Sequence, residues 1–181
     1  MEPELFSQAG MEQSCQKFSN RLNSETDQRG PSFNVFMQNR FESCCFETKT
    51  LLLSFPVTEA MRNPMGVMHG GAVAGAMDIT MGSLTFYCSG EFITPTISMN
   101  VSYERPIATG KRLFVEAACL SCGRTMAYAT ARGWLEGAPE KTVCSATGTY
   151  YTASGVRKKT APHKTKSRLQ FPCSRDFSIF L

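Results

Sequence analysis

The sequence predicts an α+β domain in which a curved antiparallel sheet wraps one long buried helix. A long apolar segment, residues 70–88, is predicted to be helical. Several segments after it alternate with a period of two, and short turn signals separate them. This order of elements is typical of an α+β architecture. The chain has 181 residues, of which 42% are hydrophobic, so it has the material for one domain with flanking segments.

The N-terminal part is predicted to be a polar extension of 32 residues. It carries a short helix near 11–22, and Gly30-Pro31 interrupts the chain after it. The domain itself is predicted over 33–152. Its first strand is expected over 45–57, where alternate side chains are apolar.

The segment 70–88 is predicted to be a helix that is buried on all sides. Apolar side chains lie all round its axis, which is typical of a helix inside a core. Its one charged residue is Asp78, and a buried carboxylate is costly unless it is paired or solvated. We therefore expect Asp78 to face a cleft; an exposed position on a helix edge is the alternative.

Four strands are predicted after the helix. Apolar and hydroxyl or amide side chains alternate over 96–103, which is the pattern of a strand with two different faces. Turn signals then separate three further predicted strands, at 112–120, 124–135 and 142–152.

The cysteines are expected to be reduced thiols inside the cell. The chain begins without a basic and apolar leader, so we expect no signal peptide, and a cytoplasmic location is predicted. Acidic residues in the first 30 positions disfavour mitochondrial import, which stays a weaker alternative beside a nuclear location. The lone pair Cys119 and Cys122 lacks two further ligands, and the chain has only two histidines, so no metal site is expected.

The net charge of +4 comes from the C-terminal tail, residues 153–181. The tail carries seven Lys or Arg residues and one acid, whereas the first 152 residues have a net charge of −2. We expect a basic, disordered tail. Nucleic-acid binding is not expected of the domain, although the tail leaves a nucleic-acid, nuclear-signal or lipid function open. No segment has the length and apolar character of a membrane span.

Two glycines at the start of the helix point to an anion or oxyanion site. Gly70 and Gly71 leave backbone N–H groups accessible where the helix dipole is positive, although they could equally permit close packing. Asp78 follows Gly71 by seven residues, so the two share a helix face about 10 Å apart. That distance is too long for both to act on one carbonyl, so the spacing suggests a dimer whose sites are shared between chains.

These residues resemble the hotdog-fold acyl-CoA thioesterases of the PaaI type, and most closely their acyl-coenzyme A thioesterase 13 branch. The likeness covers roughly 33–151 and rests on three motifs. The first is Asn63-x-x-Gly66-x-x-His69-Gly70-Gly71, followed by Asp78. The second is Asn100-Val101-Ser102-Tyr103-x-x-Pro106, and the third is Ser121-Cys122-Gly123-Arg124-Thr125. The resemblance implies a hotdog fold with five or six strands. It also implies homodimers that pair through their sheets, often assembled into tetramers.

The resemblance implies hydrolysis of an acyl-CoA to a free acid and CoA, a reaction of lipid metabolism that needs no cofactor. The Gly71 N–H would polarise the thioester carbonyl, and Asn63 would hold the thioester or the attacking water. Asp78 of the partner subunit would be the general base, which we favour, or the nucleophile. Thr96 is placed to orient the water or Asp78, unless it is an ordinary strand residue. His69 is a catalytic candidate whose role could equally be structural.

The CoA moiety needs cationic groups or backbone donors for its phosphates. By resemblance, its contacts would come from one tyrosine after the helix and from the hairpin turn: Tyr103, Ser121, Gly123, Arg124 and Thr125. Medium- to long-chain fatty acyl groups suit the nearest branch, and aromatic acyl groups suit the wider family.

Two other functions are open on the same fold. A hotdog hydratase or dehydratase would use an Asp/His pair on the helix, and no histidine follows Asp78 there. A non-catalytic acyl-CoA sensor would bind the ligand without turnover. The presence of Asn63, Gly71 and Asp78 together favours the enzyme.

Overall fold

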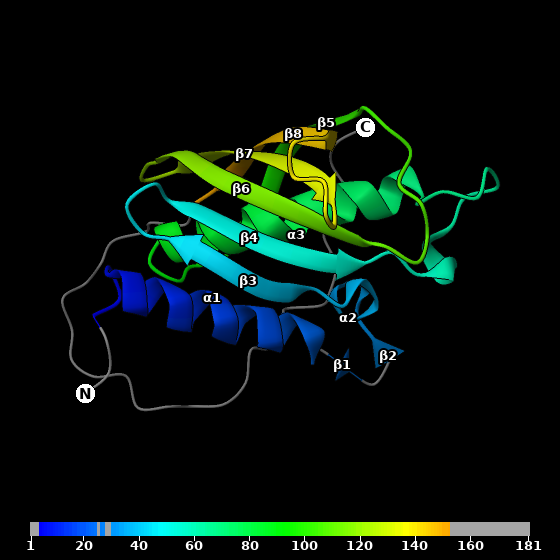
Figure 1. Ribbon diagram of the computed structural model, residues 1–181. Helices are drawn as coiled ribbons and strands as arrows, with labels where there is room; N and C mark the ends of the chain where they lie inside the picture. Colours follow the sequence, from blue (N-terminus) through cyan, green and yellow to red (C-terminus); the bar gives the residue numbers. More distant parts are fainter. Residues whose placement is uncertain (1–3, 25, 28–29, 153–181) are drawn as a thin grey trace, which may run out of the picture.

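The computed structural model describes residues 4–24, 26–27 and 30–152, and it places one long helix against a six-stranded antiparallel sheet (Figure 1). The strand order is β3-β4-β6-β7-β8-β5. The strands of this sheet are β3 (Arg40–Cys45), β4 (Thr50–Pro56), β5 (Thr96–Tyr103), β6 (Arg112–Cys122), β7 (Met126–Leu135) and β8 (Thr142–Tyr151). The predicted α+β architecture is confirmed. The basic tail lies outside the described residues.

The smaller elements precede the sheet or join its strands. They are α1 (Gln8–Asn23), the two-residue strands β1 (Thr26–Asp27) and β2 (Gly30–Pro31), α2 (Phe33–Met37) and a 3-10 turn, Glu59–Met61. None of the helices in the described part of the chain is long and apolar enough to cross a membrane.

The long helix α3 (Gly70–Cys88) has the predicted bounds and is the centre of the core. Apolar side chains from successive turns, such as Met77, Met81 and Leu84, are fully buried against the sheet. The buried hydroxyls of Thr80 and Ser83 form hydrogen bonds within the helix. Each donates to the backbone carbonyl four residues earlier, at 2.8 and 2.6 Å. The helix therefore stays buried without unpaired side-chain hydroxyls at these positions.

One predicted strand is in fact half of a hairpin. The expected strand over 45–57 is β4, which pairs with β3 through a turn in which Lys49 has a positive φ of 52°. Sequence reasoning missed most of β3 because its side chains do not alternate strictly between buried and exposed. The strands predicted after the helix agree with β5 to β8 to within about two residues at their ends.

Strand β5 lies at an edge of the sheet and exposes much of its apolar face. It pairs only with β8 among the described strands. Ile97 and Tyr103 are 50% and 58% exposed. An exposed edge of this kind offers unpaired backbone groups to another chain.

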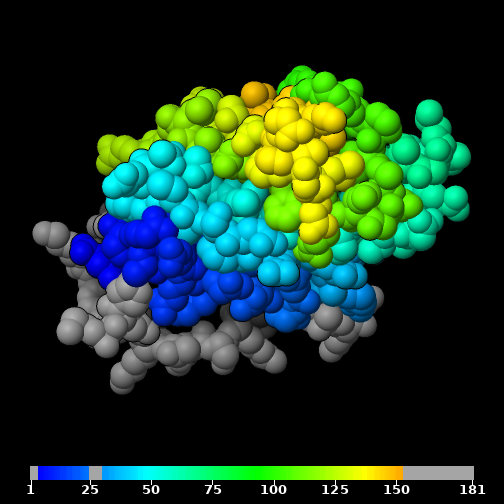
Figure 2. All heavy atoms as spheres, in the orientation of Figure 1, coloured from blue at the N-terminus to red at the C-terminus, as the bar shows by residue number. Residues whose placement is uncertain are grey.

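Helix α1 packs directly on the domain. It is longer than the predicted short helix, and it places Met11 and Cys15 in the core. Figure 2 shows its blue atoms packed against the cyan atoms of the β3–β4 region. Burial raises the pKa of the Cys15 and Cys144 thiols to about 12, so both act as small neutral core residues at neutral pH. The proposed boundary at residue 33 stays a prediction.

Candidate active site

Asp78 lies in the middle of α3 and receives two hydrogen bonds on the same oxygen. Thr96 Oγ1 donates to Asp78 Oδ1 at 2.7 Å, and the Tyr150 hydroxyl donates to it at 3.1 Å. Thr96 on β5 and Tyr150 on β8 are directly paired in the sheet, so the strand register brings both hydroxyls to one carboxylate. The side chain is half-buried and lines a cavity, as expected from its place in an otherwise apolar helix.

Tyr150 is a residue that sequence reasoning missed. Its side chain is fully buried, and two glycines make room for the ring. A Cβ on Gly148 would lie 2.8 Å from the ring, and one on Gly82 would lie 3.7 Å from it. Burial, together with the neighbouring Asp78 carboxylate, raises the pKa of Tyr150 well above the usual tyrosine value. The hydroxyl therefore remains a donor to Asp78 at physiological pH. The only signal in the sequence was Gly148, a small residue two positions before Tyr150 on the same face of the strand.

His69 caps the start of α3 and already uses the Gly71 N–H. The imidazole Nδ1 accepts a hydrogen bond from the Gly71 N–H at 2.9 Å. The N–H predicted to polarise a thioester carbonyl is therefore engaged by His69 in this conformation, and its role as an oxyanion donor stays a prediction. The bond also requires Nδ1 to be unprotonated, so a neutral His69 carries its proton on Nε2. A capping role of this kind is the structural alternative weighed for His69.

Asn63 shapes the turn before the helix. Its side-chain oxygen accepts from the backbone N–H groups of Met65 and Val67 at 2.9 and 3.3 Å. Gly66 in this turn has a φ of 82°, which favours glycine. Because the oxygen is committed to the turn, the amide Nδ2 is the part of Asn63 suited to a ligand.

A cavity of about 320 Å³ lies at the start of α3. It is lined by Asn63, Gly70 and Tyr103, among others. The Tyr103 hydroxyl donates to the Gly70 carbonyl at 3.3 Å, and the tyrosine side chain is largely exposed. The structure thus brings Asn63, Gly70 and Tyr103 to one cavity.

The hairpin residues lie at the opposite end of the helix. Gly123 and Arg124 line a cavity of about 310 Å³ together with Cys88 and Ser89, which end α3. Ser121 lines a neighbouring cavity of about 250 Å³. Thr125 lies in the same turn, where its carbonyl accepts from the Thr152 N–H at 2.9 Å.

The predicted site residues therefore fall into three groups along one helix. A 19-residue helix is about 28 Å long, so the glycine end, Asp78 and the hairpin cannot meet within one chain. Among the residues that the structure describes, no cluster of three or more His, Cys, Asp or Glu side chains could hold a metal ion.

A long helix wrapped by a six-stranded antiparallel sheet is the architecture of the hotdog fold. Residues 65–141 match the family model of the thioesterase superfamily. Acyl-coenzyme A thioesterase 13 from Mus musculus is 30% identical over 82 residues. That match covers 44% of this chain and 57% of the mouse protein, so the chain spans little more than half of this curated relative.

Solved structures show the same fold. Zebrafish thioesterase superfamily member 2 has a TM-score of 0.66 at 20% identity, covering 76% of this chain and 94% of that one. A Streptococcus mutans protein solved with bound acetyl-CoA has a TM-score of 0.55 at 21% identity, covering 62% and 87% of the two chains. The predicted hotdog fold and the resemblance to these thioesterases are confirmed.

Proposed function

We propose that this chain is an acyl-CoA thioesterase that hydrolyses a fatty acyl-CoA to the free acid and CoA. The observation that carries the proposal is the Asp78 carboxylate, which two hydroxyls orient beside a largely apolar cavity. The likeness to acyl-coenzyme A thioesterase 13 and the acetyl-CoA bound to a protein of the same fold support it. A cytoplasmic location stays a prediction from the sequence.

In the proposed reaction, Asp78 acts as a general base. Both hydrogen bonds fall on Oδ1, so Oδ2 is the oxygen available to a water molecule. That water loses a proton to Oδ2 as it attacks the thioester carbonyl. The tetrahedral intermediate then expels the CoA thiolate, which takes the proton and leaves as the thiol. A nucleophilic Asp78 would instead form an anhydride with the acyl group.

The oxyanion of this intermediate needs donors at the start of a second helix. We propose that the His69 ring swings off the Gly71 N–H when the thioester binds, which frees that donor for the oxyanion. Asn63 would add its Nδ2 from the turn beside it. The Gly71 N–H lies about 10 Å from Asp78 along their own helix, and Asn63 lies in the turn before that helix, so both groups would serve Asp78 of the partner subunit.

A two-fold dimer through β5 would make that arrangement. Two antiparallel copies of β5 would continue the sheet from one chain into the next and cover the exposed Ile97 and Tyr103. The two α3 helices would then lie close together, each presenting its Asp78 to the other's first turn. A tetramer would follow if two such dimers pack together.

One observation favours a second candidate, a non-catalytic acyl-CoA sensor. The Gly71 N–H is engaged by His69, and a site that kept this bond would lack its main oxyanion donor. Such a protein would bind acyl-CoA and release no thiol.

A thiol-release assay separates the two candidates. The purified protein is given a panel of acyl-CoAs from acetyl to palmitoyl, with phenylacetyl-CoA as the aromatic member, and free CoA is measured. We expect release with fatty acyl-CoAs. Binding of the same compounds without release would select the sensor and overturn the proposed enzyme.

Thr96 offers a matched pair of variants for the role of the hydroxyl. Thr96→Val removes one donor from the carboxylate with little change in shape, and we expect kcat to fall about tenfold, because hydrogen bonds to charged groups contribute about 1.5–3 kcal/mol. Thr96→Ser keeps the hydroxyl and should retain most of the activity. Equal kcat values for the two variants would show that the hydroxyl does not position Asp78.

A further inference from the structure

We infer that helix α1, which precedes the segment matching the thioesterase superfamily, forms a wall of the acyl pocket and that Phe18 sets its length. The inference rests on the proposed function for the identity of the ligand. It names the acyl chain that the site accepts and the residues that limit it.

The cavity beside Asp78 is lined by both polar and apolar residues, with Asn34, Ser83 and Thr94 among the polar ones. Its volume is about 240 Å³, and Asp78 and Thr96 are its reactive polar groups. Two of its wall residues, Phe18 and Leu22, come from α1. The other apolar lining residues are Ile79, Phe86, Ile93 and Pro95. A carboxylate beside apolar walls suits a reacting carbonyl with a hydrocarbon chain attached.

One face of α3 forms the floor of this cavity. Asp78, Gly82 and Phe86 follow one another at intervals of four residues, so their positions lie one above another on the same face. The face thus presents a carboxylate, then no side chain, then an aromatic ring, over about 12 Å. Because Gly82 carries no side chain, no side chain on this face stands between the carboxylate and the ring, and we call this stretch of the cavity the channel.

Phe18 closes the far end of that channel. Its ring stacks on Phe86 with the centroids 4.2 Å apart and the planes 16° from parallel. Because Phe86 is two helical turns beyond Asp78, the stacked pair lies where the end of an acyl chain would arrive. Leu22, one turn further along α1, lines the side of the channel.

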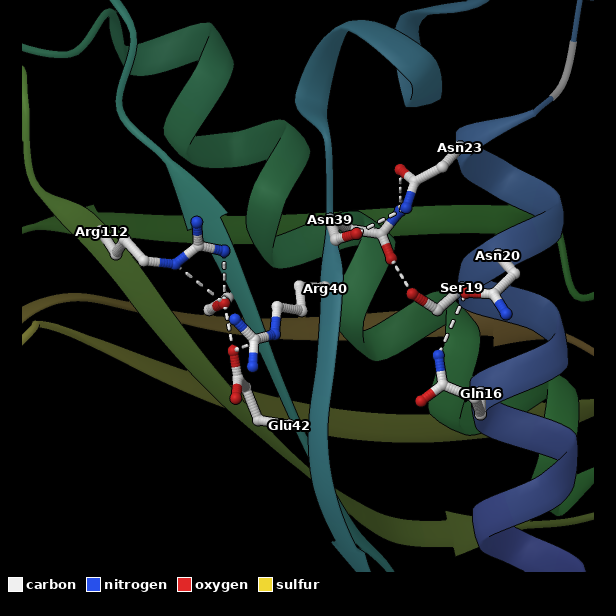
Figure 3. Close-up of polar contacts among 9 residues, drawn as sticks. Gln16, Ser19, Asn20, Asn23, Asn39, Arg40, Glu42 and Arg112 are labelled. Carbon is white, nitrogen blue, oxygen red and sulfur yellow. Dashed lines mark hydrogen bonds and ion pairs between the residues drawn. The ribbon is translucent and has the colours of Figure 1, made fainter.

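Helix α1 is held firmly enough to act as a wall. Besides its buried apolar residues, it is tied by polar contacts at two places. The Ser14 hydroxyl donates to Glu91 beyond the end of α3 at 2.6 Å. Ser19 donates to the buried Asn39 at 2.5 Å, and Asn23 donates to the Asn39 carbonyl at 2.6 Å (Figure 3).

The volume indicates a medium-length chain. An apolar protein cavity of about 150 Å³ holds a benzene ring, which has six carbons. By proportion, a cavity of 240 Å³ holds about ten carbons. We therefore propose medium-chain acyl groups as the best ligands, with longer chains stopped by the Phe18 ring.

Binding measurements in the Asp78→Asn variant test the inference without turnover. Dissociation constants are measured by calorimetry for acyl-CoAs of 6 to 16 carbons. Each methylene group that becomes buried is expected to lower the dissociation constant about fourfold. We expect affinity to increase up to about ten carbons and then to stop increasing. Adding Phe18→Ala should move that limit to longer chains, and Phe18→Leu should move it less. Lys17→Ala, on the exposed face of α1, should leave the limit unchanged.

A second variant works in the opposite direction and avoids the core of α1. A Cβ on Gly82 would meet only the Tyr150 ring, at an ordinary 3.7 Å, so Gly82→Ala is expected to fold. A methyl group at position 82 would stand between Asp78 and Phe86 on this face of the helix and should shorten the preferred chain. Unchanged chain-length limits in both Gly82→Ala and a folded Phe18→Ala would overturn the inference.

The outcomes keep the inference and the proposed function apart. Chain-length-dependent binding that the variants shift, with no thiol release from the wild-type protein, would support the pocket and reject the enzyme. Thiol release whose dependence on chain length is the same in the wild type, Phe18→Ala and Gly82→Ala would support the enzyme and reject α1 as a wall of the acyl pocket.

Discussion

The Asp78→Asn variant is expected to lose about 10²–10⁴-fold in kcat, the contribution typical of a positioned general base. Asparagine has nearly the same shape as aspartate and still accepts hydrogen bonds from Thr96 and Tyr150 through its oxygen. What it lacks is the charge that takes up the proton of the attacking water. The measurement is thiol release under saturating acyl-CoA, with wild-type protein as the reference.

The fold of this variant should be unaffected. The side chain is half-buried and faces a cavity rather than the packed core, so thermal unfolding and the elution volume of the assembly should match those of the wild type. A near-normal kcat in folded Asp78→Asn would show that another group activates the water. Our assignment of the carboxylate would then be wrong.

The second large expected effect is the recovery of activity in mixed dimers. We expect Asn63→Asp to be inactive, because it keeps the oxygen that shapes the turn but replaces the amide donor with a charge. Asp78→Asn is expected to be inactive for the reason above. If each site combines Asn63 of one chain with Asp78 of the other, a mixed dimer has one site with both changes and one wild-type site. Its activity should return to about half that of the wild type, per dimer.

The experiment uses two differently tagged chains that are co-expressed and purified through both tags. The two single-variant homodimers, mixed after purification without exchange of chains, are the matched control and should remain inactive. Verified mixed dimers that stay as inactive as this control would rule out shared sites. Each site would then have to be built within one chain, which the length of α3 opposes.

Local pattern was enough to predict the long helix and the strands after it. The helix 70–88 could be delimited because its apolar residues are continuous and its flanking residues are helix-ending signals, all within the segment itself. The choice of Asp78 as a candidate site residue also came from local sequence, since it is the only charged residue in an apolar helix. Thr96 was predicted from a resemblance, and the structure places its hydroxyl 2.7 Å from that carboxylate.

Contacts between distant segments decided the rest. Tyr150 reaches Asp78 across 72 positions, and it does so only because β8 pairs with β5 in one particular register. Most of the edge strand β3 and the docking of the predicted N-terminal helix were hidden for a similar reason, since their burial depends on partners elsewhere in the chain. The periodicity of a helix or strand follows from residues that are close in the sequence. The lining of a cavity depends on which elements pack around it. The sequence by itself therefore determined the elements and the carboxylate, and the tertiary structure decided that His69 engages the Gly71 N–H and that Phe18 stacks on Phe86 at the cavity beside Asp78.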